Sequence, residues 1–197
     1  MIIVGLTGGI GSGKTVVANY FAELGIPIYI SDNEAKKLMV TSKVIREELK
    51  ALLGENTYIG DEINKAFIAD KIFNDKNYLK QINAIVHPRV NTHFNTWVTK
   101  QKSPYVIKET AILFENGSHE SCDYIITVTA PKHLRIKRVL ERDNTSTKRI
   151  EAIMKNQWED KKKIQFSDFN IENIYLQSTK NQVLVIHDKI VGYPKVM

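Results

Sequence analysis

The sequence predicts an α/β fold in which a parallel sheet of five strands is covered by helices on both faces. Two observations favour this class. Short, nearly continuous apolar runs alternate with helical stretches, and a glycine-rich loop joins the first apolar run to the first helix. Strands of a parallel sheet read as continuous apolar runs because crossover helices bury both of their faces.

The individual elements follow from local signals. Five apolar runs have the composition of buried strands: residues 2–7, 28–30, 105–108, 124–129 and 183–187. The first helix is expected over residues 14–24, before a glycine and a proline that end it. Ser31 or Asp32 is expected to cap a second helix over residues 33–53.

Two longer stretches interrupt the alternation of strands and helices. A helical insertion over residues 61–102 is broken at Pro88, and a highly charged helical stretch covers residues 131–165. Insertions on such sheets carry substrate contacts or mobile lids. The 197 residues therefore fit one domain, with its core in residues 1–60, 103–130 and 166–197.

Composition narrows the range of partners and compartments. The net charge of +6 suits nucleic acid, an anionic membrane or an anionic small substrate, and it equally suits simple solubility. The single cysteine, Cys122, excludes an intramolecular disulfide and fits a reducing cytoplasm. No apolar run approaches the length of a membrane span, and residues 1–6 lead directly into the glycine loop, unlike a signal peptide.

The glycine loop carries the chemistry. Residues 8–15 match G-x-x-x-x-G-K-[ST] at every fixed position, between an apolar strand and a helix. Glycines let several backbone N–H groups point inward, and the helix presents its positive end to phosphates. Lys14 would reach the β- and γ-phosphates, and the Thr15 hydroxyl would ligate magnesium. The sequence thus predicts a P-loop, the name used below for residues 8–15.

Other nucleotide-binding classes do not fit. In a dinucleotide-binding G-x-G-x-x-G pattern the third glycine would fall on Lys14. A GTPase needs D-x-x-G and N-K-x-D, yet no aspartate has glycine three residues later, and Asn64-Lys65 is followed by Ala66 and Phe67. Helicase and other motor proteins are larger, so small-molecule kinases remain.

Two carboxylates and a basic helix face are candidates for such a kinase site. Asp32 follows the second strand and either takes the proton of the acceptor hydroxyl or merely caps a helix. Glu109 ends the third strand and either holds magnesium or is an exposed strand-end charge. One helix face carries three arginines, which fit a lid that closes over ATP or a solvated surface: Arg135, Arg138 and Arg142. The basic residues 148–149 and 161–163 are interpreted as solvated charge.

These residues together resemble the dephospho-CoA kinase family over nearly the whole chain. Residues 5–15, GLTGGIGSGKT, closely resemble the opening of its members. Four later matches follow in order: Ser31-Asp32, His87-Pro88, the stretch AILFE at 111–115, and Arg138 to Asp143 with Gln157 downstream. The sequence departs from the family pattern at Ile30, Ala111 and Lys65.

The resemblance implies transfer of the γ-phosphoryl group of ATP to the 3′-hydroxyl of the dephospho-CoA ribose, with magnesium, in the cytoplasm. It implies a P-loop kinase core with a CoA-binding helical insertion and a lid. The implied catalytic residues are Asp32, Lys14 and Arg142. The implied ATP-binding residues are Gly9, Ile10, Gly11, Ser12, Gly13, Lys14, Thr15, Val16, Arg138 and, near the adenine, Asn173. The implied substrate-binding residues are Asp32, Lys65, His87, Arg89 and Leu113, and the implied metal ligands are Thr15 and Glu109.

Two rival functions remain open at this point. Another P-loop kinase would act on a nucleoside monophosphate or a small metabolite, although the insertion offers mainly Arg89 for such an acceptor. A nucleotide-dependent regulator or nucleic-acid-binding module has only the charge of +6 in its favour. We expect ATP and dephospho-CoA as ligands, no nucleic-acid or membrane partner, and a monomer or small homo-oligomer.

Overall fold

The computed structural model describes residues 1–192, which divide into two compact units. The first contains Met1–Ile30 and the chain from Gln101 onward, and the second is Ser31–Lys100. The sequence places the start of the helical insertion at residue 61, whereas the second unit begins at Ser31. The reason is packing, because helices α2 (Ser31–Thr41) and α3 (Lys43–Leu53) both contact α5 (Asn77–Val98).

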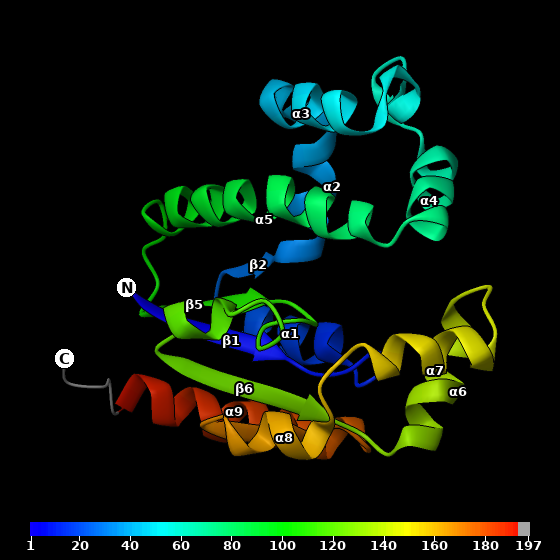
Figure 1. Ribbon diagram of the computed structural model, residues 1–197. Helices are drawn as coiled ribbons and strands as arrows, with labels where there is room; N and C mark the ends of the chain where they lie inside the picture. Colours follow the sequence, from blue (N-terminus) through cyan, green and yellow to red (C-terminus); the bar gives the residue numbers. More distant parts are fainter. Residues whose placement is uncertain (193–197) are drawn as a thin grey trace. The chain divides into compact units, whose positions relative to one another are not determined.

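The first unit is built on a parallel five-stranded sheet with the order β2-β5-β1-β6-β7 (Figure 1). Its strands are β1 (Ile2–Thr7), β2 (Ile28–Ile30), β5 (Tyr105–Glu109), β6 (Tyr124–Thr129) and β7 (Phe169–Glu172). The central strand β1 pairs in parallel with β5 on one side and β6 on the other. The predicted fold class is therefore confirmed.

Side chains that alternate along the strands of the sheet pack into two separate hydrophobic cores. Leu6 of β1 and Ile126 of β6 belong to a large core closed by α1 (Lys14–Glu23) and α9 (Leu176–Gly192). Ile125 of β6 belongs to a smaller core with Leu113 and Phe114, against which Trp158 packs. Because successive residues of a strand point to opposite faces, these cores lie on the two sides of the sheet. Both faces are covered, as expected for parallel strands.

The fifth predicted strand is wrong. Residues 183–187 lie inside helix α9, and the fifth strand of the sheet is β7. Val183, Ile186 and Ile190 are buried at helical spacing, while Val185 between them is exposed. A short apolar run fits a strand or a helix equally well, and here its flanks extend it into a helix.

Three further helix predictions need correction. The helix expected over residues 33–53 is two helices, and Ser42 caps the second, because its Oγ accepts from the N–H of Ile45 at 3.4 Å. Ser31 and Asp32 lie inside the first turn of α2 rather than before it. Pro88 does not break its helix, since α5 continues through it.

The second unit is mainly helical. It also contains α4 (Lys65–Asn74) and a short antiparallel hairpin of β3 (Tyr58–Ile59) and β4 (Glu62–Ile63), which the sequence did not indicate. A row of buried side chains along α5 carries its core: Ile82, Val86, Val90 and Phe94. Their spacing of four residues places them on one face of the helix.

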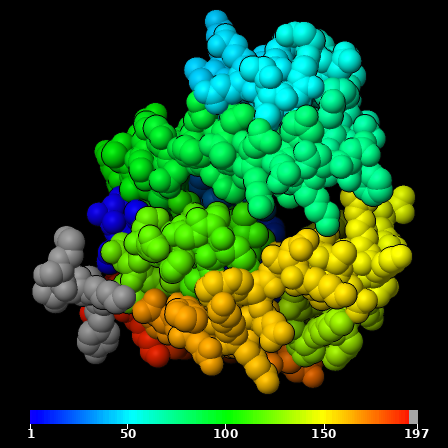
Figure 2. Space-filling view, in the orientation of Figure 1, coloured from blue at the N-terminus to red at the C-terminus, as the bar shows by residue number. Residues whose placement is uncertain are grey.

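The charged segment of residues 131–165 folds as three helices of the first unit. These are α6 (Lys132–Arg142), α7 (Thr147–Lys155) and α8 (Asp160–Gln165). In Figure 2 the residues of α7 and α8, yellow to orange, form one continuous surface. None of the helices in residues 1–192 is long and apolar enough to span a membrane.

Candidate functional site

The P-loop connects β1 to α1 and leaves backbone donors available. Gly13, just before α1, has φ 90° and ψ 30° and makes no side-chain cap. The N–H of Ser12 turns back to the carbonyl of Gly9 at 3.1 Å. Within residues 1–192, the N–H groups of Gly11, Gly13 and Thr15 have no partner. Such a set of N–H groups at the positive end of a helix is suited to bind phosphate.

The side chain of Asn173 holds the backbone of the P-loop. Its Nδ2 donates to the carbonyl of Ser12 at 2.9 Å, and its Oδ1 accepts from the hydroxyl of Thr179 at 3.0 Å. A Cβ on Gly13 would come within 1.9 Å of that Nδ2, so only glycine fits there. Asn173 is buried, and its side chain is bound to Ser12 of the loop and to Thr179 of α9. The structure therefore supports a loop-holding role, and the contact near adenine stays a prediction.

Lys14 and Glu109 form a mostly buried pair beside the P-loop. The Nζ of Lys14 donates to the carbonyl of Gly8 at 3.1 Å and lies 3.7 Å from Oε1 of Glu109. Glu109 ends β5 and is the register partner of Leu6 in β1, which brings its carboxylate to the loop. Its side chain is 9% exposed, so the alternative of an exposed strand-end charge is excluded.

The surroundings of the loop fit a phosphate ligand and its metal ion. Nη1 of Arg138 is buried with no hydrogen-bond partner, and it lies 4.0 Å from the position of a Cβ on Gly13. A buried guanidinium nitrogen next to the start of α1 is suited to bind an anion.

No cluster of three His, Cys, Asp or Glu side chains that could hold a metal occurs in residues 1–192. Magnesium in kinases uses few protein ligands besides phosphates and water, so Thr15, whose side chain is exposed, and Glu109 fit that pattern.

The side chain of Arg142 donates its hydrogen bonds to the neighbouring Asp143. Its Nε and Nη2 both donate to the carboxylate of Asp143 at 2.8 Å. This pairing lowers the pKa of the Asp143 carboxyl. The Arg142 side chain is 64% exposed. The structure thus brings Arg138 to the P-loop but leaves Arg142 at the surface, and a catalytic role for Arg142 stays a prediction.

The second unit brings together two of the predicted substrate residues. Asp32 is exposed in the first turn of α2, and His87 lies half-buried on α5, against which α2 packs. Burial lowers the pKa of His87, and the negative charge of Asp32 partly opposes this shift. Arg89 instead forms an ion pair with Glu48, and Lys65 is exposed at the start of α4.

His87 predicts a pH dependence of stability. Since its pKa is lower in the folded than in the unfolded protein, the unfolded state binds more protons below about pH 6.5. We expect the free energy of unfolding to fall as the pH drops from 7 through this range. The His87→Gln variant should lose part of that slope in urea titrations at several pH values. The same change at the exposed His133 should leave the slope as it is, and equal slopes in all three proteins would contradict the prediction.

Leu113, one of the predicted substrate-binding residues, lies in the core of the first unit. Its side chain is fully buried in the smaller core. A Cβ on Gly5 would come within 2.7 Å of Leu113 and 3.0 Å of the sulfur of Cys122. Leu113 therefore has a packing role, and a contact with substrate stays a prediction. Burial also raises the pKa of the Cys122 thiol to about 11, so this thiol is protonated at neutral pH.

The basic run at residues 161–163 is not uniformly solvated. Lys163 is fully buried, and its Nζ lies 3.0 Å from Oε1 of Glu115 and donates to the carbonyl of Ala111 at 2.9 Å. The same Glu115 oxygen accepts from the N–H of Trp158 at 2.7 Å. This cluster links the loop after β5 to α8 and to Trp158, which precedes α8. No sequence pattern indicates it, because one buried lysine cannot be told from its exposed neighbours by composition.

Replacing Lys163 with methionine should destabilise the protein strongly. The change leaves the carboxylate of Glu115, 14% exposed, without its cation, and breaking such a pair costs about 3–5 kcal/mol. We expect a loss of this size in urea denaturation. The exposed Lys161 provides the matched control, since Lys161→Met should change stability by less than about 0.5 kcal/mol. Equal effects of the two changes would contradict the buried pair.

This chain is similar to known proteins over most of its length. The family model described as dephospho-CoA kinase matches residues 2–177. A dephospho-CoA kinase of Bacteroides fragilis is 41% identical over 173 residues, which cover 87% of this chain and 84% of that protein. A crystal structure from Thermus thermophilus has a TM-score of 0.85 at 29% identity, covering 94% of this chain and 95% of that one. A dephospho-CoA kinase from Campylobacter jejuni shares the fold, with a TM-score of 0.70 at 21% identity and coverage of 96% and 97%.

Proposed function

This chain belongs to the dephospho-CoA kinase family, and we propose that its P-loop, Lys14 and Asp32 carry out the reaction of that family. The enzyme phosphorylates dephospho-CoA with ATP, the last step of coenzyme A biosynthesis. The observation that carries the assignment of the site is the P-loop with its available N–H groups and the Lys14 ammonium beside it.

ATP is bound in this proposal through its phosphates. The N–H groups of Gly11, Gly13 and Thr15 donate to phosphate oxygens, and Lys14 and Arg138 supply positive charge. Phosphoryl transfer spreads negative charge over the γ-phosphoryl oxygens, so donors and cations fixed in advance lower the barrier. Arg142 is the further cation that reaches the phosphates if the segment 131–165 closes as a lid.

Magnesium belongs to the same proposal. Thr15 and Glu109 are the protein groups that would hold it, directly or through water. When bound, the ion neutralises charge on the β- and γ-phosphates. The pair of Lys14 and Glu109 at 3.7 Å keeps a cation and a carboxylate side by side at the loop, so that each sets the orientation of the other.

Asp32 is the proposed general base. It follows directly after β2, whose carboxyl end is the kind of sheet edge where open α/β sheets bind ligands. Its exposed carboxylate is free to accept the proton of the 3′-hydroxyl of the dephospho-CoA ribose as phosphoryl transfer proceeds. His87, on which the charge of Asp32 acts, belongs with Lys65 and Arg89 to the proposed CoA-binding region in residues 61–102.

We further propose a cytoplasmic enzyme that acts as a monomer or small homo-oligomer and has no nucleic-acid or membrane partner. The charge of +6 then serves two polyanionic substrates, ATP and dephospho-CoA. A protein that used this charge to bind RNA or DNA would lose affinity steeply with salt, which a binding titration at two salt concentrations detects.

The experiment that tests the function measures ADP release with ATP and magnesium in the presence of dephospho-CoA, of AMP, or of no acceptor. We expect strong turnover only with dephospho-CoA, and CoA as the product by mass spectrometry. Turnover with AMP alone would make the protein a nucleotide kinase. Release of ADP without dependence on any acceptor would favour a nucleotide-dependent regulator.

A further inference from the structure

The backbone of Ile10, in the middle of the P-loop, is held on both of its polar groups by distant side chains. Its N–H donates to Oε1 of Gln157 at 2.9 Å, and its carbonyl accepts from Nε of Arg135 at 2.8 Å. Both side chains come from the segment of residues 131–165. A residue with both backbone groups bound cannot rotate freely, so this segment fixes one point of the loop.

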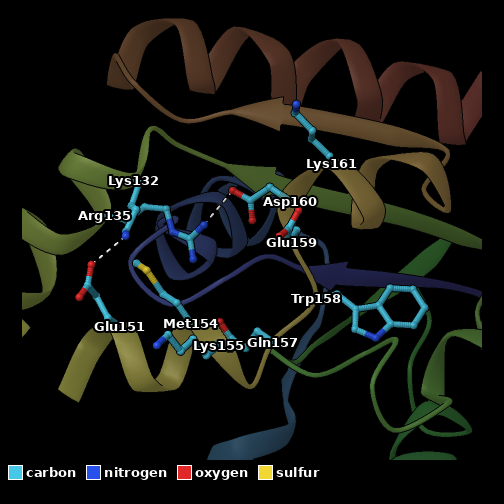
Figure 3. A pocket seen from close by; sticks show the side chains of 10 residues that line it. All are labelled: Lys132, Arg135, Glu151, Met154, Lys155, Gln157, Trp158, Glu159, Asp160 and Lys161. Carbon is cyan, nitrogen blue, oxygen red and sulfur yellow. Dashed lines mark hydrogen bonds and ion pairs between the residues drawn. The ribbon is translucent and has the colours of Figure 1, made fainter. Parts of the chain in front are cut away.

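Arg135 is itself held in place. Its Nη1 lies 2.8 Å from Oδ2 of Asp160, and the two side chains are only 9% and 24% exposed. A Cβ on Gly9 would come within 2.0 Å of Nη2 of Arg135, so the guanidinium lies directly against the loop backbone. Figure 3 shows Arg135 reaching from α6 toward Asp160 at the start of α8. The contacts thus form one chain from Asp160 through Arg135 to Ile10.

A neighbouring ion pair provides an internal comparison. Arg135, Gln157 and Asp160 line a pocket of about 630 Å³. Lys132 also lines this pocket, and its Nζ pairs with Oε1 of Glu151 at 2.7 Å (Figure 3). That pair joins α6 to α7, its side chains are 65% and 43% exposed, and its bond does not reach the loop. Two cations on one helix therefore differ in whether they hold the P-loop.

We propose that Arg135 is a positioning residue for ATP, which Asp160 holds in place and which acts through the backbone of Ile10. A P-loop binds phosphates only when several N–H groups point inward at once. A loop held in that shape before binding loses less conformational entropy when the nucleotide arrives, and so binds more tightly. The proposal rests on the use of ATP stated above and adds a residue outside the motif that sets ATP affinity.

The test compares ATP binding with acceptor binding. We expect Arg135→Met to weaken ATP binding about tenfold, or about 1.4 kcal/mol, by titration calorimetry without acceptor. The KM for ATP should rise in parallel, while the KM for dephospho-CoA stays unchanged. Asp160→Ala should give a smaller change in the same direction. The double variant should bind ATP no more weakly than Arg135→Met alone, because Asp160 acts through Arg135.

The control is Lys132→Met, which removes a cation from the same helix and pocket and should leave ATP binding unchanged. Additive effects of the Arg135 and Asp160 substitutions, equal rises in both KM values, or wild-type ATP affinity in Arg135→Met would each overturn the proposal. If Arg135→Met does not fold, Asp160→Ala carries the same test, since it leaves Arg135 present but without its anchor. A wild-type protein that binds ATP yet does not phosphorylate dephospho-CoA would count against the function and not against this inference.

Discussion

Asp32→Asn should bind ATP as the wild type does and lose most of its turnover. The change keeps the size of the side chain and removes its ability to take a proton. Loss of a general base costs about 10²–10⁴-fold in rate. Asp32 is exposed in the first turn of α2 and has no structural ion pair to lose among the described residues, so the fold should be unaffected. Steady-state kinetics with saturating ATP and dephospho-CoA measure the effect.

A control for this variant comes from His87. The charge of Asp32 raises the pKa of His87 against the larger effect of burial. Removing that charge should therefore lower the pKa of His87 further, which an NMR titration of its ring detects independently of catalysis. Turnover near the wild-type rate, together with the lowered pKa of His87, would mean that Asp32 is only a charge at the start of a helix and not the general base. Glu34→Gln, on the same helix, provides a comparison because Glu34 pairs with Lys37 and His93 instead.

The P-loop could be predicted in detail because its geometry is local. The glycines, Lys14 and Thr15 have fixed spacing, and the strand and helix on either side are adjacent in sequence. The parallel sheet followed from the apolar runs for four of its strands. The fifth, β7, has only one fully buried residue, Ile171, and so lacks a continuous apolar run.

The resemblance points to Asn173 and the helix spacing to Arg135, but the contacts by which they hold the loop could not be predicted. Asn173 and Arg135 contact the P-loop from positions more than a hundred residues away in the sequence. The spacing of apolar and charged residues within one helix or strand does not indicate such a contact. Sequence spacing shows Arg135 only as part of a basic helix face, which serves a lid or a solvated surface equally well. The interpretation of Lys163 is wrong for a related reason, because a run of lysines is usually solvated and only the fold shows which one turns inward.

The predicted lid and insertion also depend on contacts that sequence patterns do not encode. The run from Ser31 to Leu53 looks like part of an α/β core because it follows a strand directly. Its helices α2 and α3 nevertheless pack on α5 and so belong to the second unit. Packing partners, and not the order of elements, decide where one unit ends.

Lys14→Ala is expected to lower kcat by about 10²–10³-fold, the usual cost of removing one group that stabilises developing charge. The Lys14 ammonium contacts the carbonyl of Gly8 and the carboxylate of Glu109, and in the proposed function it acts on phosphates bound at the loop. Stopped assays that follow CoA formation measure the loss. Activity near that of the wild type would count against the whole assignment of the P-loop.

The structure adds a complication to that experiment and also a way to resolve it. Removing Lys14 takes away a positive partner of the mostly buried Glu109, so Lys14→Ala should also lower thermal stability. In the double variant Lys14→Ala with Glu109→Gln the unbalanced charge is gone, and stability should recover. Activity should not recover, because the double variant lacks both the ammonium that acts on the phosphates and the carboxylate proposed to hold magnesium. A double variant that regains both stability and activity would mean that Lys14 and Glu109 serve the fold and that catalysis depends on neither side chain.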